Sequence, residues 1–81
     1  MNEKDFLSWL QNENHMTIRS SRDVVSRVKR VFKLIDNNNV SLKTIDELNE
    51  LDEFKKLTVT IKSQLRRSIV LYIDYCKSVR G

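Results

Sequence analysis

The side chains that could do metal or nucleophilic chemistry are few and widely separated. His15 and Cys76 are the only histidine and the only cysteine among the 81 residues. A metal site or a Cys–His catalytic pair needs more ligands or partners than these two supply. Cys76 falls on an apolar stripe and is expected to be a buried structural thiol. His15 falls in a polar stretch, where we expect a solvated loop residue or, failing that, a phosphate contact. We therefore predict no metal, no cofactor and no small-molecule ligand.

A second group of candidates is a run of carboxylates: Asp46, Glu47, Glu50, Asp52 and Glu53. Acid–base catalysis by paired carboxylates requires a sheltered pocket that separates their pKa values. These five lie on a short polar helix, where a solvated face is expected. A glycine-rich phosphate loop is absent too, because the single glycine is Gly81. The sequence thus assigns no catalytic residue.

Positive charge on one helix is the strongest chemical signal. In residues 17–36, TIRSSRDVVSRVKRVFKLID, the apolar side chains share a stripe roughly 100° wide. The opposite face carries Arg19, Arg22, Ser26, Lys29, Arg30 and Lys33. An ordinary solvated helix mixes signs along such a face, but no acidic residue lies at the centre of this one. The pattern predicts a polyanion as partner; a basic solvated surface without a ligand is the alternative.

Charge also alternates along the whole chain. The net charge of +4 divides into −2 over 1–14, +5 over 15–35, −5 over 36–54 and +6 over 55–81. The last segment adds Lys62, Arg66 and Arg67. Two helices that present Lys and Arg together suit phosphate binding, because each contact releases counterions without demanding a base sequence. A fold that brings the two basic segments together would have one strongly positive side.

These side chains must be positioned by helices, since the chain has no proline, one glycine and 40% apolar residues. We predict a short helix over 3–13 and a long helix from the N-cap Thr17 to Asp36. A short third helix should open on a Thr44–Glu47 capping box and break before Phe54. The fourth should start near Thr58 or Thr60, despite a strand-like run there, and continue to about Ser78. The expected fold is all-α: one domain, 1–81, forming a compact four-helix orthogonal bundle in short-long-short-long order.

Two features bear on partners and location. Val70 and Leu71 lie away from the apolar stripe of the last helix, so they either contact another domain or protomer or are covered by the first or second helix. No segment resembles a signal peptide or a membrane span, which predicts a cytoplasmic protein without a membrane partner.

The order of residues resembles the N-terminal core-binding, or SAM-like, domain of the tyrosine recombinases, also called phage integrases. An "F-x-x-W/Y-L" first helix and a capped long second helix are matched here by Phe6, Leu7, Trp9, Leu10, Met16, Thr17, Ser20, Val24, Val28, Val31, Phe32, Leu34 and Ile35. The family often has Tyr at the place of Val24. The family's third helix has the pattern "I-T-x-x-D/E-I/L", which is resembled here by Ser41, Leu42, Thr44, Ile45, Asp46, Glu47 and Leu48. Its fourth helix ends on "aromatic-x-Tyr-Leu", which is resembled by Thr58, Thr60, Leu65, Ile69, Tyr72, Ile73, Tyr75 and Cys76.

The resemblance implies a domain that arches over duplex DNA with its second and fourth helices toward the major groove. The implied DNA surface is Arg19, Ser20, Arg22, Ser26, Lys29, Arg30, Lys33, Lys62, Arg66 and Arg67. Family catalysis belongs to a separate domain, so this chain is expected not to be an enzyme, and Tyr72 and Tyr75 are interpreted as packing residues. The parent protein would be a longer recombinase, with neighbouring protomers on DNA as further partners, or a stand-alone relative.

Two other functions remain open from the sequence. A helical protein-interaction or regulatory module would dock a partner through the Val70 and Leu71 face. RNA binding shares the same electrostatics, although a chain without exposed aromatic platforms is less suited to stacking single-stranded bases.

Overall fold

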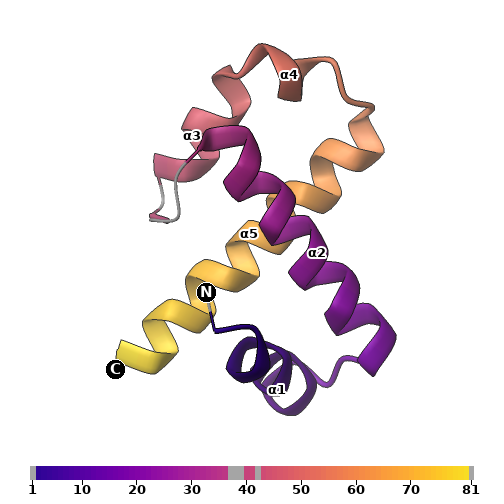
Figure 1. Cartoon of the computed structure of the whole chain (residues 1–81), viewed down its shortest axis with the longest axis vertical. Helices are drawn as coiled ribbons and strands as arrows, with labels where there is room; N and C mark the ends of the chain where they lie inside the picture. Colours follow the sequence, from indigo (N-terminus) through magenta and orange to yellow (C-terminus); the bar gives the residue numbers. More distant parts are fainter. Residues whose placement is uncertain (1, 37–39, 42, 81) are drawn as a thin grey trace.

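The computed structural model describes residues 2–36, 40–41 and 43–80, and every regular element in these ranges is an α-helix. In chain order they are α1 (Glu3–Glu13), α2 (Ile18–Ile35), α3 (Lys43–Glu50), α4 (Asp52–Lys55) and α5 (Val59–Arg80) (Figure 1). The all-helical class is confirmed, but the described residues form five helices, in the order short, long, short, short, long, where we predicted four. The one-turn helix α4 is an addition, and it arises from the predicted break before Phe54, which falls at Leu51.

Local hydrogen bonds explain where α2 begins and ends. The Thr17 hydroxyl accepts the backbone N–H of Ser20 at 3.1 Å, which makes Thr17 the N-cap that the sequence predicted. At the other end Asp36 adopts a left-handed conformation with φ 51°, and its N–H donates to the carbonyl of Phe32. The three asparagines 37–39 that follow in the sequence lie outside the described residues.

The start of α3 differs from the prediction. Thr44 is not the N-cap but the second residue of the helix, with its side chain buried. The Ser41 hydroxyl accepts the N–H of Lys43, and the Ser41 N–H donates to the Thr44 hydroxyl at 2.8 Å. The Thr44 N–H also donates to the Ser41 carbonyl at 3.0 Å, so Ser41 and Thr44 are bonded in both directions and take the place that we assigned to Thr44 and Glu47. The prediction failed because Ser and Thr suit both positions of such a pair, and the sequence placed the box three residues too late.

The strand-like run before α5 enters a helix, as expected. Val59 and Thr60 are already helical, and the Thr58 hydroxyl accepts the N–H of Ile61 at 3.3 Å. β-Propensity is weak without a partner strand, and the described residues contain none. A Thr at the cap position thus decides the local structure.

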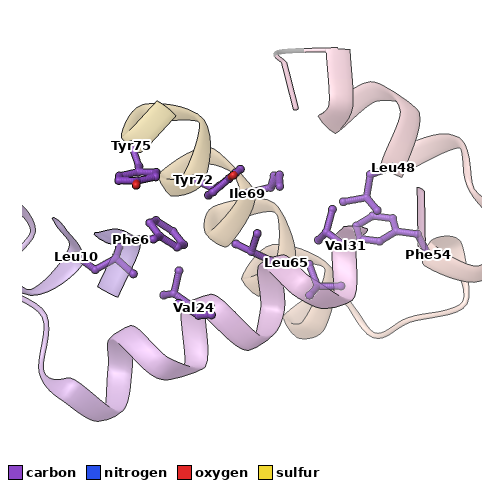
Figure 2. Close-up of a cluster of buried hydrophobic side chains, with 12 residues drawn as sticks. Phe6, Leu10, Val24, Val31, Leu48, Phe54, Leu65, Ile69, Tyr72 and Tyr75 are labelled. Carbon is purple, nitrogen blue, oxygen red and sulfur yellow. The ribbon is translucent and has the colours of Figure 1, made fainter. Parts of the chain in front are cut away.

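The two long helices cross, and the three short ones complete the core at either end. α2 packs most extensively against α5, while α1 lies beside one end of this crossing and α3 and α4 beside the other (Figure 1). Figure 2 shows the resulting core in two halves, with Phe6, Leu10, Val24, Tyr72 and Tyr75 near α1 and Val31, Leu48, Phe54 and Leu65 near α3 and α4. Ile69 of α5 lies between the halves. Both long helices, α2 and α5, therefore contribute side chains to both halves of the core.

The half near α1 is aromatic. The Phe6 ring lies 5.1 Å from the rings of both Tyr72 and Tyr75, centroid to centroid. Each tyrosine is 8% exposed, so their interpretation as packing residues is confirmed. Burial, with a smaller contribution from Cys76, raises the pKa of Tyr72 to about 12. Both the burial and the raised pKa disfavour a nucleophilic phenolate.

Two further expectations on the last helix can be compared with the structure. Cys76 is half-buried rather than buried; it packs against the core near the C-terminal end of α5. Within the described ranges no helix combines the length and the apolar character that crossing a membrane requires.

Candidate nucleic-acid interface

The basic face of α2 follows from how that helix is buried. Ser21, Val24, Val25, Val28 and Val31 point into the core. The 3.6-residue period then turns the opposite side to solvent. All six residues that the sequence placed there are exposed, namely Arg19, Arg22, Ser26, Lys29, Arg30 and Lys33. We call the four cations Arg19, Arg22, Arg30 and Lys33 the α2 ridge.

Lys29 differs from the ridge because it has an anionic neighbour. Its ammonium group forms an ion pair with the carboxylate of Glu3 in α1, and both side chains are about half exposed. Such surface pairs are worth roughly 0–1 kcal/mol, so this one adds little stability. It does neutralise Lys29 locally, which leaves the ridge as the more available positive charge.

The three basic residues expected from α5 do not share one surface. Arg67 is exposed, whereas Lys62 and Arg66 are half-buried. On a helical wheel they lie roughly 140° and 100° around the helix from Arg67. The guanidinium carbon of Arg66 lies 5.6 Å from the centre of the Phe54 ring in α4, a cation–π arrangement, and the buried Arg66 Nε has no hydrogen-bond partner among the described residues. The structure therefore places Arg66 against α4 and only Arg67 toward α2.

A groove of about 510 Å³ brings α2 and α5 together on that side. Ser20 and Arg67, both assigned to the DNA surface from the sequence, line it. Its other polar lining residues are His15, Thr17, Asp23, Arg27, Gln64 and Ser68. His15 is exposed, and its left-handed backbone (φ 53°) carries the chain from α1 toward α2. The solvated loop position expected for His15 is confirmed.

Sequence reasoning missed Arg27 and Gln64. Thr17, Ser20, Asp23 and Arg27 follow one another at intervals of three or four residues, so a helical wheel places them on one flank of α2. That signal was available, but it did not say which flank of α2 meets α5. The crossing of the two helices settles this, because Gln64, Arg67 and Ser68 of α5 face the flank that carries Arg27.

The remaining candidates lie elsewhere. The side chains of Asp46, Glu47, Glu50, Asp52 and Glu53 are all exposed, which confirms the predicted solvated acidic face. Val70 is 41% exposed, whereas Leu71 is half-buried and packs against the core. The two thus do not present an equally open apolar surface.

Comparison with known proteins yields no relative: no family model matches the chain, and no curated protein or solved structure is significantly similar to it. A functional assignment therefore depends on the chemistry of the α2 ridge and the neighbouring groove, together with the residue pattern of the sequence.

Proposed function

We propose that this chain is a duplex-DNA-binding domain that holds DNA through the α2 ridge and Arg67. The observation that supports this most is the ridge itself: Arg19, Arg22, Arg30 and Lys33 are exposed along one side of one helix, with no carboxylate at the centre of that side. Together with Arg67 they make five cations, and each of the five could neutralise one phosphate.

The dimensions of α2 suit a duplex. From Arg19 to Lys33 the helix rises about 21 Å, enough to pass several phosphates of one strand. An α-helix with its side chains is about 10–12 Å wide, which fits the major groove of B-DNA. The ridge would then contact phosphates at the groove edges, and most of the affinity would be independent of base sequence.

We further propose that the DNA-binding domain belongs to a site-specific recombinase of the tyrosine recombinase type, acts in the cytoplasm and takes the SAM-like arrangement. The support is the residue pattern described above and its agreement with the face that charge alone selects. Catalysis would then come from another domain, because the two tyrosines of this chain are packed in its core.

The competing function, a protein-interaction module using Val70 and Leu71, has weaker support. Of the pair, Val70 is 41% exposed and Leu71 is half-buried. Sedimentation at several concentrations, with and without DNA, separates the two functions, since an interaction module would self-associate or capture protein independently of DNA.

The direct test is a titration of a mixed-sequence duplex with the chain by fluorescence anisotropy at several salt concentrations. Four to six phosphate contacts predict a log–log slope of affinity against salt of about −4 to −5. Absence of binding at low salt, or a flat response, would reject DNA binding. An RNA duplex of the same sequence serves as the comparison for RNA binding.

A further inference from the structure

The groove between α2 and α5 differs from the ridge in shape and in composition. The ridge is a convex line of separate cations, whereas the groove is concave and combines guanidinium groups from two helices, Arg27 of α2 and Arg67 of α5. Its volume of about 510 Å³ falls in the range of roughly 300–1,000 Å³ typical of small-ligand sites. A phosphate group with its attached sugar is of a size that such a site takes.

Most polar groups that line the groove donate hydrogen bonds. Arg27 and Arg67 can only donate, and the Gln64 amide and the Ser20 hydroxyl can donate as well. The Thr17 hydroxyl oxygen already accepts the N–H of Ser20, so its own hydrogen is free to point elsewhere. A ligand that only accepts hydrogen bonds, such as a phosphodiester, complements this set. Arginine is well suited to it, because its planar guanidinium can donate two parallel bonds to phosphate oxygens.

The position of the groove at the start of α2 adds a fixed dipole. Thr17 is the N-cap of α2, and Ser20 lies in its first turn. The N-terminal end of a helix carries a partial positive charge, which favours an anion within about one turn. The dipole thus acts in the same direction as the two guanidinium groups.

We infer that this groove binds a single phosphodiester of the DNA backbone, with Arg27 and Arg67 clamping it from two helices and Thr17 and Ser20 donating from the start of α2. The inference rests on the proposed function for its natural ligand, while the chemistry applies equally to free phosphate. It adds Arg27 to the binding residues. It also fixes where α5 takes part, namely at Arg67 and not at Lys62 or Arg66.

Asp23 opposes the anion in this site. It is the one carboxylate among the lining residues, and it lies one helical turn before Arg27. Because like charges repel at short range, removal of this charge should tighten phosphate binding by about threefold to tenfold. Asp23→Asn is nearly isosteric, so its effect reports charge rather than shape.

Two titrations test the inference on the whole chain. In the first, inorganic phosphate is added at low ionic strength while ¹H–¹⁵N spectra follow the backbone amides and the Gln64 and Arg side-chain signals; chloride at the same ionic strength is the control. We expect saturable shifts at the groove residues, stronger in Asp23→Asn and lost in the Arg27→Gln, Arg67→Gln double variant. Shifts that do not saturate, or that spread evenly over the α2 ridge, would overturn the site.

In the second titration the same variants bind a duplex at several salt concentrations. Because both arginines share one phosphate, the double variant should lower the magnitude of the salt slope by about 0.9, half of what two independent contacts would remove. Lys77→Gln removes an exposed cation of α5 away from the groove and should leave the slope unchanged. A double variant with the unchanged slope, or one that loses about 1.8, contradicts the shared site.

The two arms separate the inference from the proposed function. If the chain binds duplex DNA but the double variant behaves like the wild type, the site is wrong and DNA binding stands. If phosphate shifts the groove signals but no duplex binds, the anion site stands and the DNA-binding function is rejected.

Discussion

Removal of two cations from the α2 ridge is the sharpest perturbation of the proposed DNA surface. We choose Arg19→Gln with Arg30→Gln because both side chains are exposed and neither lines the groove. They lie on the outward side of the helix, about 20° apart on the wheel. Glutamine keeps helix propensity close to that of arginine, so the fold should be unaffected.

The structure sets the expected size of the effect. On the proposed surface we count one phosphate for each cation of the α2 ridge and one at Arg67, since Lys29 is paired with Glu3 and Arg66 packs on Phe54. Five phosphate contacts give a salt slope of about −4.5, so wild-type affinity should fall about 500-fold between 50 and 200 mM salt. Three contacts give about −2.7, and the double variant should lose only about 40-fold over the same range.

Anisotropy titrations of one labelled duplex at four or more salt concentrations measure both slopes. The matched control is Lys43→Gln with Lys77→Gln, which removes the same charge from exposed positions off the ridge. Net charge is then equal in the two double variants. If the control lowers the slope as much as the ridge variant, binding reflects overall charge and the ridge is not the interface. An unchanged slope in the ridge variant leads to the same conclusion.

Three further predictions concern the fold that positions the surface. Phe6→Ala should lower the free energy of unfolding by about 3–5 kcal/mol, because it empties a fully buried site between two tyrosine rings. Urea unfolding followed by Trp9 fluorescence measures this loss. A loss below about 1 kcal/mol would contradict the packing. Thr17→Ala should lower the free energy of unfolding by about 1 kcal/mol, because it removes the side-chain cap of α2. Thr17→Ser keeps a hydroxyl and should retain most of that stability in the same assay. Equal losses in the two variants would show that the hydroxyl is not the cap. The pKa of Tyr72, about 12 in the folded chain against 10.0 for an ordinary phenol, means that the unfolded chain loses this proton first; stability present below pH 10 should therefore decline between pH 10 and 12. Thermal melts across that range should show the decline in the wild type and less of it in Tyr72→Phe, and identical pH profiles would contradict it.

The sequence predicted correctly those features that depend on a single helix. The bounds of α1 and α2 and the outward position of the six polar residues of α2 were predictable, because the 3.6-residue period places side chains around a helix whatever it packs against. It was a weaker guide at the edges of the apolar stripe. Ser21 and Val25 are buried while Phe32 and Ile35 are half-buried, since α1 packs on one flank of α2 and Gln11 donates to the Ser21 hydroxyl.

By itself, then, the sequence determined an all-helical chain with a basic helix, and with it the polyanion as the expected partner. Only the tertiary structure decided which cations are paired or packed against other side chains and which line the groove. It pairs Lys29 with Glu3, packs Arg66 on Phe54 and places Arg27 and Arg67 in the lining of one groove. Each of these arrangements brings together residues of two different helices. Helical periodicity fixes directions within one helix but carries no information on which neighbour lies in that direction.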